Sequence, residues 1–473
     1  MEYEPVIGLE IHVQTKTKSK MFCGCDANYF NTPPNTHTCP TCLGLPGALP
    51  VPNEKAIELA VRIALALNCT INTETKFDRK NYFYPDLPKG YQITQYDQPI
   101  GVKGSLEIEL SNGTKLIDIT RVHQEEDTGK SIHQGSETLL DYNKSGVPLV
   151  EIVTEPDFRS GEEVVAFART LRLILRYLGV SDADMEKGQM RIEPNISVRK
   201  KGQTGLPPYK VETKNIGSIS VLVPVIEKEV ARQIALLENG ETPKQETRGL
   251  IDTAGNTASQ RSKEGEADYR YFPEPDIPPI VLDKTFIANQ QACIPELPSE
   301  KKKRYGDVLG ISDDIATIIV EDPTLTELFE AAASVKTDTQ HTQEIAKLIV
   351  GDVAKLLKTT SESHLTAKHV QEIIDLTLTK KVSGTVAKDL IALAFEKGVS
   401  PKEYVDKQEL GVISDESELD TVITRIISEN PKAVEDVHSN PNAVMFLVGQ
   451  VIKDMKGRAD AQTVRKLIEK QLS

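Results

Sequence analysis

The stretch Val6-Ile7-Gly8-Leu9-Glu10-Ile11-His12-Val13-Gln14 decides how the first part of this chain folds. Apolar side chains occupy its odd positions, whereas its even positions from Gly8 onward carry glycine or polar groups. Because successive side chains of a strand point to opposite faces, this alternation predicts a half-buried strand. It also places Glu10 and His12 on the same polar face, about 7 Å apart along the strand.

Three later segments repeat this contrast between two faces. They are Leu149–Glu155, Arg191–Val198 and Lys210–Lys214. A half-buried antiparallel sheet produces such alternation. An ordinary solvated face also alternates, but it favours Lys, Thr and Gln, whereas Glu, His, Asn and Arg recur here. The pattern therefore predicts one antiparallel sheet with a single ionic surface built from several strands.

The polar face of the first strand predicts a site for a hard cation. Glu10 and His12 share that face, and the carboxylates of Glu125 and Glu151 could join them across the sheet. Oxygen-rich coordination with one imidazole suits Mg²⁺ or Mn²⁺ better than Zn²⁺. Spacing alone leaves another interpretation open, in which these residues are surface groups or satisfied hydrogen-bond partners.

The sequence lacks the usual nucleotide-binding motifs. Gly129-Lys130-Ser131 resembles the end of a phosphate-binding loop, but position 124 is Gln where that motif requires Gly. No glycine-rich fingerprint precedes a predicted helix either. If ATP binds, we expect it to use the ionic sheet surface, where Arg191, Glu193 and Asn195 share one face of their strand.

Four of the six cysteines lie in two tight pairs near the N-terminus, at Cys23, Cys25, Cys39 and Cys42. Two thiolates from each pair can converge on one tetrahedral ion, which is the pattern of a structural zinc knuckle. Because all four ligands are cysteine, no coordination position stays open for a substrate. The predicted role of this zinc is structural rather than catalytic.

The length of 473 residues allows two to four domains of ordinary soluble composition. No stretch has the length of a transmembrane helix and no signal-peptide pattern opens the chain, so we expect a cytoplasmic protein. Strand and turn patterns dominate the first part, and helical spacing follows Pro295. We expect domains at 1–292, 293–405 and 406–473, and hence an α+β chain with an all-α second part.

Two segments have the composition of nucleotide or RNA contacts. Asp78–Tyr91 mixes basic and aromatic residues with rigid turns, so it could grip phosphates and stack on a base, or simply pack its rings in a core. Because the net charge is −14, RNA contacts require a local basic patch. Such a patch, or a merely solvated helix face, is formed near the C-terminus by Lys453, Lys456, Arg458, Arg465, Lys466 and Lys470.

Together these motifs resemble the B subunit of the bacterial glutamyl-tRNA(Gln)/aspartyl-tRNA(Asn) amidotransferases. The resemblance covers nearly the whole chain, with Lys144 at a position where the family would have Arg. It is carried by Val6–Gln14, Cys39–Gly47, Arg79–Gln92, Asp141–Glu151, Asp268–Asp276 and Met455–Asp460.

The resemblance implies a cradle domain with an antiparallel sheet and a zinc knuckle, then an all-α helical domain and a small α-helical tail domain that hold the tRNA. It implies a carbon–nitrogen ligase that uses ATP and Mg²⁺ to phosphorylate the side-chain carboxylate of Glu or Asp mischarged on tRNA(Gln) or tRNA(Asn). Ammonia then displaces the phosphate. Since the sequence has no amidase signature, the ammonia would come from the amidase subunit of a heterotrimer, whose third member is a small subunit.

The resemblance also implies roles for individual residues. The Mg²⁺ ligands would be Glu10, His12, Glu125 and Glu151. The cations that neutralise developing phosphate charge would be Arg79, Lys80 or Lys214. The alternative is a non-enzymatic zinc-knuckle RNA-binding or assembly protein, in which clustered Glu on a strand face would have no use. The sequence does not distinguish tRNA(Gln) from tRNA(Asn) as the physiological substrate.

Overall fold

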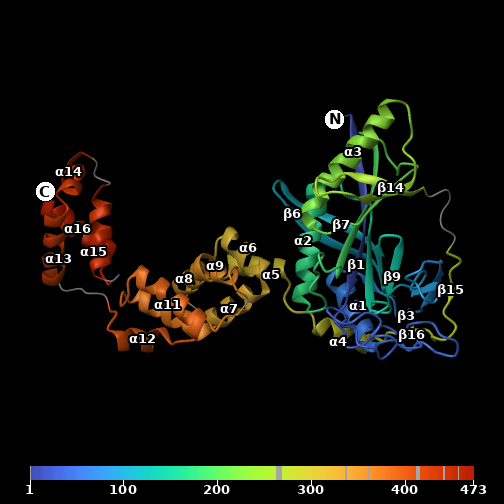
Figure 1. Ribbon diagram of the computed structural model, residues 1–473, viewed down its shortest axis with the longest axis horizontal. Coiled ribbons are helices and arrows are strands. Elements are labelled where there is room, and N and C mark those ends of the chain that lie inside the picture. The colour runs from blue at the N-terminus through green and yellow to red at the C-terminus, as the bar shows by residue number, and fades with distance from the viewer. Residues whose placement is uncertain are drawn as a thin grey trace. The chain divides into compact units, whose positions relative to one another are not determined.

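The computed structural model describes residues 2–262, 269–335, 338–360, 362–411, 416–439, 443–455 and 458–472. The chain forms two compact units, Met1–Leu297 and Pro298–Ser473, and each is described here by itself (Figure 1). A sheet with helices builds the first unit and helices build the second, which confirms the predicted α+β class. The boundaries of the three expected domains stay a prediction. Asp268 of the quoted motifs and Lys456 of the basic patch lie outside the described residues.

A large sheet dominates the first unit. In the described part of the chain it has nine strands, in the order β14-β13-β12-β11-β1-β10-β7-β6-β2. Neighbouring strands are antiparallel except β12 and β13, which run parallel. The strands are β1 Tyr3–Gln14, β2 Thr70–Ile71, β6 Gly101–Leu110, β7 Gly113–Glu126, β10 Pro148–Thr154, β11 Met190–Lys200, β12 Val211–Lys214, β13 Glu246–Leu250 and β14 Thr257–Ser262.

Smaller sheets and several helices complete the first unit. The small sheets combine β15 Phe272–Pro273 with β4 Asp78–Asn81 and β5 Tyr91–Thr94, β16 Ile280–Val281 with β3 Glu74–Thr75, and β8 Lys130–Gln134 with β9 Glu137–Asp141. The helices are α1 Glu54–Ala66, α2 Gly161–Tyr177, α3 Leu222–Glu238 after the 3-10 turn η1 Ile219–Val221, and α4 Lys284–Ala292. Lys130 therefore begins a strand and not the helix that a phosphate-binding loop would require.

The alternation of the first strand positions it at the centre of the large sheet. The odd side chains Ile7, Leu9 and Ile11 are fully buried, in one apolar core with Phe167 and Leu171 of α2. Helices α1, α2 and α3 pack on the sheet and supply the other side of this core (Figure 1). The helices pack on the apolar face of the sheet. The even side chains of β1, which include Glu10 and His12, therefore project from the opposite face.

The second unit is helical throughout its described residues. Its helices are α5 Pro298–Asp307, α6 Asp313–Glu321, α7 Pro323–Ala333, α8 Thr339–Leu348, α9 Ala354–Leu357, α10 Ala367–Leu378, α11 Gly384–Lys397, α12 Pro401–Gln408, α13 Glu416–Glu429, α14 Pro431–Ser439, α15 Val444–Asp454 and α16 Ala461–Leu472. Helices α8 and α9 are joined by a π-helical turn, η2 Ile349–Val353. Helix α10 begins at Ala367, and the side chain of Thr366 caps it by accepting a hydrogen bond from the backbone N–H of His369.

None of the helices in the described part of the chain combines the length and the apolar character needed to cross a membrane.

Candidate active site

Strand pairing gathers the polar side chains of four neighbouring strands on one face of the large sheet. His12 of β1 lies opposite Glu151 of β10, and Glu151 lies in turn opposite His123 of β7. On the other side of β1, His12 lies opposite Arg191 of β11. Directly opposed residues of an antiparallel pair point to the same face, so these residues form one continuous row. We call the face that carries this row the ionic face.

Of the four residues predicted to bind a hard cation, the three glutamates converge on the imidazole of the fourth, His12. Its Nε2 atom lies 3.3 Å from Glu125 Oε1, 3.4 Å from Glu151 Oε2 and 3.8 Å from Glu10 Oε1. Glu125 and Glu151 are buried, with side chains 2% and 6% exposed, whereas Glu10 is 32% exposed. The cluster therefore opens to solvent on the side of Glu10.

This donor set fits a divalent cation. One ligand atom each from Glu10, His12 and Glu151 lie within 4.8 Å of one another, and so do atoms from His123, Glu125 and Glu151. Carboxylate oxygens with imidazole are ligands that Mg²⁺ and Mn²⁺ accept. Three carboxylates crowded in a partly desolvated place also need positive charge, since their mutual repulsion is otherwise uncompensated.

The charges of this cluster shift the pKa values of its members. Burial opposes protonation of His12, but hydrogen bonds and the charges of Glu125 and Glu151 raise its pKa well above the ordinary value. Burial alone would raise the pKa of Glu151, yet His123 and His12 hold it well below the usual range. Burial and the charge of Glu151 raise the pKa of Glu10. The ionised state of Glu151 thus depends on the two imidazoles beside it.

The residues of the ionic face that were not singled out in the sequence include His123, Asp127 and Arg121, whose guanidinium lies 3.7 Å from Glu151 Oε1. His123 is buried, with its Nε2 atom 3.3 Å from Glu151 Oε2 and a buried Nδ1 without a hydrogen-bond partner among the described residues. Its spacing to Glu125 repeats that of Glu10 to His12, so strand parity could have identified it. Asp127 follows β7 and accepts hydrogen bonds from Lys144, 2.9 Å away, and from Arg191, 3.3 Å away. No local pattern identified Asp127.

Lys80 is the cation that the small sheet brings to the cluster of Glu10, His12, Glu125 and Glu151. Burial opposes its charge, but Glu125 and Glu151 raise its pKa above the ordinary value. The ammonium lies 4.9 Å from the centre of the Tyr269 ring, and burial raises the pKa of neighbouring Tyr271 to about 12. Lys80 thus supplies positive charge beside the carboxylates, between them and an aromatic wall.

The structure does not bring Arg79 to the ionic face. Arg79 precedes Lys80 on β4, so the two side chains point to opposite faces. Its guanidinium makes a bidentate contact with Glu274, at 2.6 and 2.8 Å, and lies 4.3 Å from the centre of the Tyr91 ring. The side chain of Glu274 is fully buried. These contacts hold the guanidinium of Arg79 against Glu274, so a role of Arg79 toward a phosphate stays a prediction.

The residues expected to contact a nucleotide lie along the same face as the cluster around His12. Glu193 of β11 lies opposite Glu10, and Asn195 lies opposite Gly8. Lys214 of β12 forms ion pairs of 2.9 Å with Glu193 and 3.1 Å with Glu212. Arg191 has a raised pKa because the charge of Asp127 outweighs its burial. Arg191 and Lys214 thus place positive charge on this face beside the cluster around His12.

The four cysteines predicted to form a zinc knuckle lie together. Their sulfur atoms are within 4.8 Å of one another, and all four are free thiols. The backbone N–H of Cys39 donates a hydrogen bond to the sulfur of Cys42 over 3.1 Å. Cys23 donates a further one, which lowers the pKa of Cys42 to about 5. Four thiol groups at this spacing fit a tetrahedral zinc ion.

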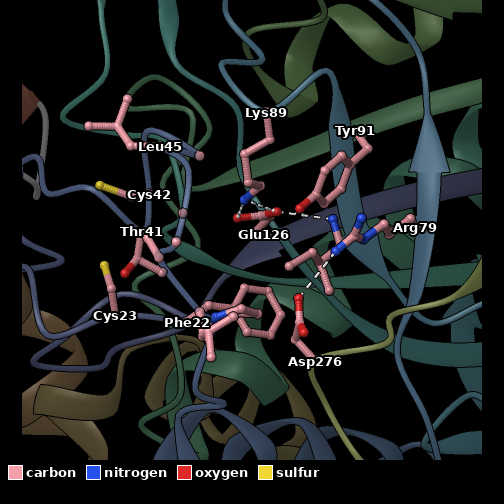
Figure 2. Close-up of a pocket in the computed structure, with 17 residues that line it drawn as sticks. Phe22, Cys23, Thr41, Cys42, Leu45, Arg79, Lys89, Tyr91, Glu126 and Asp276 are labelled. Carbon is pink, nitrogen blue, oxygen red and sulfur yellow. Dashed lines mark hydrogen bonds and ion pairs between the residues drawn. The ribbon is translucent and has the colours of Figure 1, made fainter.

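A cavity of about 220 Å³ opens beside the cysteine cluster (Figure 2). Cys23, Cys42 and Leu45 line one side, and Arg79, Lys89 and Glu126 line the other. Lys89 Nζ pairs with Glu126 Oε1 at 2.5 Å, and Arg79 faces Asp276 at 3.5 Å. The cavity thus has walls of charged pairs on one side and the knuckle on the other.

Comparisons with known proteins identify the family of this chain. The model of the GatB/GatE catalytic domain matches residues 5–288, and that of the GatB domain matches residues 327–472. Proteins named as the B subunit of aspartyl/glutamyl-tRNA(Asn/Gln) amidotransferase are similar over the whole chain. The one from Thermotoga petrophila is 44% identical over 483 residues, which are 100% of this chain and 99% of that protein. The one from Carboxydothermus hydrogenoformans is 42% identical over 482 residues, again 100% and 99%. This chain therefore belongs to the GatB family, with a GatB/GatE catalytic domain at its N-terminal end and a GatB domain at its C-terminal end.

Proposed function

We propose that the chain acts as the B subunit of an aspartyl/glutamyl-tRNA(Asn/Gln) amidotransferase. In this role it uses ATP to phosphorylate the side-chain carboxylate of Asp or Glu mischarged on tRNA(Asn) or tRNA(Gln), and ammonia then replaces the phosphate. The observation that carries the proposal is the convergence of Glu10, Glu125 and Glu151 on His12, in a chain that is similar to such subunits over its full length.

Different residues of the ionic face would perform different parts of this reaction. Phosphoryl transfer requires positioned cations and little covalent chemistry from the protein. When bound, Mg²⁺ would neutralise charge on the transferring phosphoryl group. Glu10, His12, Glu125 and Glu151 would hold it, with His123 fixing the orientation of Glu151 through their 3.3 Å contact.

The cations beside the metal ligands would bind the nucleotide. Lys80 lies next to Glu125 and Glu151, so it is placed to neutralise charge that develops on a phosphate. Lys214 is paired with Glu193 and Glu212, and a phosphate would compete with these carboxylates for its ammonium. Asp127 orients Arg191 along the same face, and Asn195 contributes a neutral polar side chain there.

The ammonia and the tRNA that this reaction uses imply that the chain binds partner subunits and tRNA. At neutral pH ammonia is mostly ammonium, which is not a nucleophile, so its delivery must be protected from water. We therefore infer a partner that releases ammonia from glutamine, the amidase subunit, and a small third subunit that completes a heterotrimer. The helical second unit would hold the tRNA, with the basic residues near the C-terminus facing its backbone. We infer that the complex works in the cytoplasm, where aminoacyl-tRNA is made.

We also infer that the knuckle holds a structural Zn²⁺. Replacing Cys39 with Ser should release the zinc and destabilise the first unit, whereas Cys293→Ser is the matched control because Cys293 is an exposed thiol outside the cluster. Metal analysis of the purified chain measures this directly. A folded, zinc-free wild-type protein would remove the inference.

The experiment that tests the proposed function is reconstitution with the partner subunits. We expect the chain to co-purify with the amidase and the small subunit and to convert Glu-tRNA(Gln) or Asp-tRNA(Asn) into the amidated product when glutamine, Mg²⁺ and ATP are present. A separate assay with each mischarged tRNA identifies the substrate. Binding of tRNA without any Mg-ATP-dependent product would instead favour the RNA-binding or assembly protein.

A further inference from the structure

Lys20 is a fully buried lysine at the edge of the cysteine cluster, with none of its surface exposed. Its ammonium donates hydrogen bonds to the carbonyl oxygens of His37, at 2.7 Å, and Tyr142, at 3.3 Å. Its remaining described contact is the sulfur of Cys42, at 3.8 Å. Of these three partners, only the sulfur can carry a negative charge.

A buried ammonium without an anionic partner is strongly destabilising, since its hydration is lost and nothing replaces the opposite charge. The cysteine cluster, in contrast, has an excess of negative charge when it binds zinc. Four thiolates on one Zn²⁺ carry two net negative charges, and the hydrogen bond from the N–H of Cys39 to Cys42 offsets only part of this charge. The positive charge of Lys20 and the negative charge of Cys42 therefore stabilise each other, but only while Cys42 is a thiolate.

The same lysine ties the cluster to a loop that leads towards the ionic face. Gly146 of this loop packs against both residues, because a Cβ at its position would lie 3.5 Å from Lys20 Cδ and 3.6 Å from Cys42 Cβ. The N–H of Met21 donates to the carbonyl oxygen of Gly146 over 2.7 Å. Further along the loop, Lys144 pairs with Asp127.

We propose that Lys20 is the counter-ion of a metal centre formed by Cys23, Cys25, Cys39 and Cys42, and that it couples this centre to the loop at residues 142–147. The proposal rests on the zinc inferred above. It assigns to Lys20 a positioning role: the ammonium raises the affinity of the thiolates for the metal and holds the loop against the knuckle.

The test is a comparison of zinc affinity in full-length variants, by competition with a chromogenic zinc chelator. Lys20→Met removes the ammonium, and Lys18→Met is the matched control because Lys18 is an exposed lysine two residues away. Residues that support metal ligands typically account for about 10- to 100-fold in affinity, so we expect a loss of that size for Lys20→Met and none for Lys18→Met. Equal zinc affinity of wild type and Lys20→Met would overturn the proposal.

Two further variants separate charge from packing. Lys20→Gln keeps a donor for the carbonyl oxygens but not the charge, so it should lose affinity as well, and it replaces Lys20→Met if that variant does not fold. Wild-type affinity of Lys20→Gln would show that the charge is not used. In a Cys42→Ser background, Lys20→Met should have little further effect, because its anionic partner is already gone. If the wild-type chain bound no zinc at all, the inferred zinc itself would be wrong, a result distinct from unchanged affinity.

Hydrogen exchange measures the coupling to the loop. We expect the backbone amides of residues 142–147 to lose protection in Lys20→Met and when a chelator strips the wild type, but not in Lys18→Met. Unchanged protection of these amides in both cases would contradict the coupling.

Discussion

His12 and Glu151 face each other across the antiparallel pair β1–β10, with the Nε2 atom of His12 3.4 Å from Glu151 Oε2. The same carboxylate oxygen lies 3.3 Å from Nε2 of His123 on the next strand of the row. One oxygen is thus shared by imidazoles from two different strands. This sharing requires the register of three strands, β1, β10 and β7, to be correct at once, so the sheet itself brings together the residues proposed to bind Mg²⁺.

Glu125→Gln should abolish most of the ATP hydrolysis that mischarged tRNA stimulates. The substitution keeps the shape of the side chain but removes a buried ligand charge beside His12. Because metal stabilisation of transition-state charge is worth several kcal/mol, we expect a loss of roughly 100-fold or more. Glu107→Gln on β6, an exposed carboxylate, is the control and should behave like the wild type. Full activity of folded Glu125→Gln in the complex would exclude Glu125 as a ligand.

Lys80→Met should lower the turnover of ATP without unfolding the protein. Lys80 is the cation next to Glu125 and Glu151, and we expect its charge to act on the transferring phosphate. Removal of one such stabilising group typically costs about 100- to 1,000-fold in turnover. Steady-state kinetics with saturating ATP measure it. A variant with normal turnover and only weaker ATP binding would assign Lys80 to ground-state binding instead.

Unlike Lys80→Met, Arg79→Met should lower the stability of the protein rather than act directly on ATP turnover. Removing Arg79 leaves the fully buried carboxylate of Glu274 without its bidentate partner, which costs about 3–5 kcal/mol for pairs of this kind. Thermal unfolding should shift downward accordingly. The double variant Arg79→Met/Glu274→Gln should recover much of the loss, since no buried charge remains. If Arg79→Met were as stable as the wild type but inactive, the structural role of Arg79 would be contradicted.

The stability of the second unit should depend on pH through the charge of Glu330. Burial would raise the pKa of Glu330, but hydrogen bonds from Lys301, Arg304 and Tyr305 lower it. The folded-state pKa is then below the unfolded value of about 4.3, so the carboxylate stabilises the fold fully above that pH. This stabilisation is lost as the pH falls through the folded-state pKa.

The variant Glu330→Gln isolates this effect. At neutral pH it should reduce the exchange protection of the amides in α5 and α7 relative to the wild type. The difference between variant and wild type should shrink below about pH 4.3. Glu327→Gln, an exposed carboxylate on the same helix, is the control. A difference that stayed constant down to acidic pH would contradict the role of the Glu330 charge.

Much of the ionic face could be predicted because strand parity is a local property. Alternation placed Glu10 and His12 together, and the same rule could have found His123 from its spacing to Glu125. Parity also separates Arg79 from Lys80, although the resemblance had grouped them as cations for the phosphate. What binds Arg79 could not be read locally, since Glu274 is 195 residues further along the chain.

The cysteine cluster likewise has one feature that the sequence predicts and another that it does not. The pairing of Cys23 and Cys25 with Cys39 and Cys42 follows from spacing, and the four sulfur atoms do lie together. The burial of Lys20 against Cys42 depends on the loop that contains Tyr142 and Gly146, which reaches the knuckle only in the folded sheet. Contacts between distant segments carry this information, and no single window of the sequence contains it.

The central claim is that the chain activates an aminoacyl carboxylate by transferring phosphate to it. The most direct measurement uses Glu-tRNA(Gln) or Asp-tRNA(Asn) with ¹⁸O in the side-chain carboxylate, reacted with ATP, Mg²⁺ and ammonia in the presence of the partner subunits. Transfer to the carboxylate and displacement by ammonia move one carboxylate oxygen into the phosphate, so we predict ¹⁸O in the inorganic phosphate released. Amidated tRNA formed together with phosphate that contains no ¹⁸O would contradict the claim.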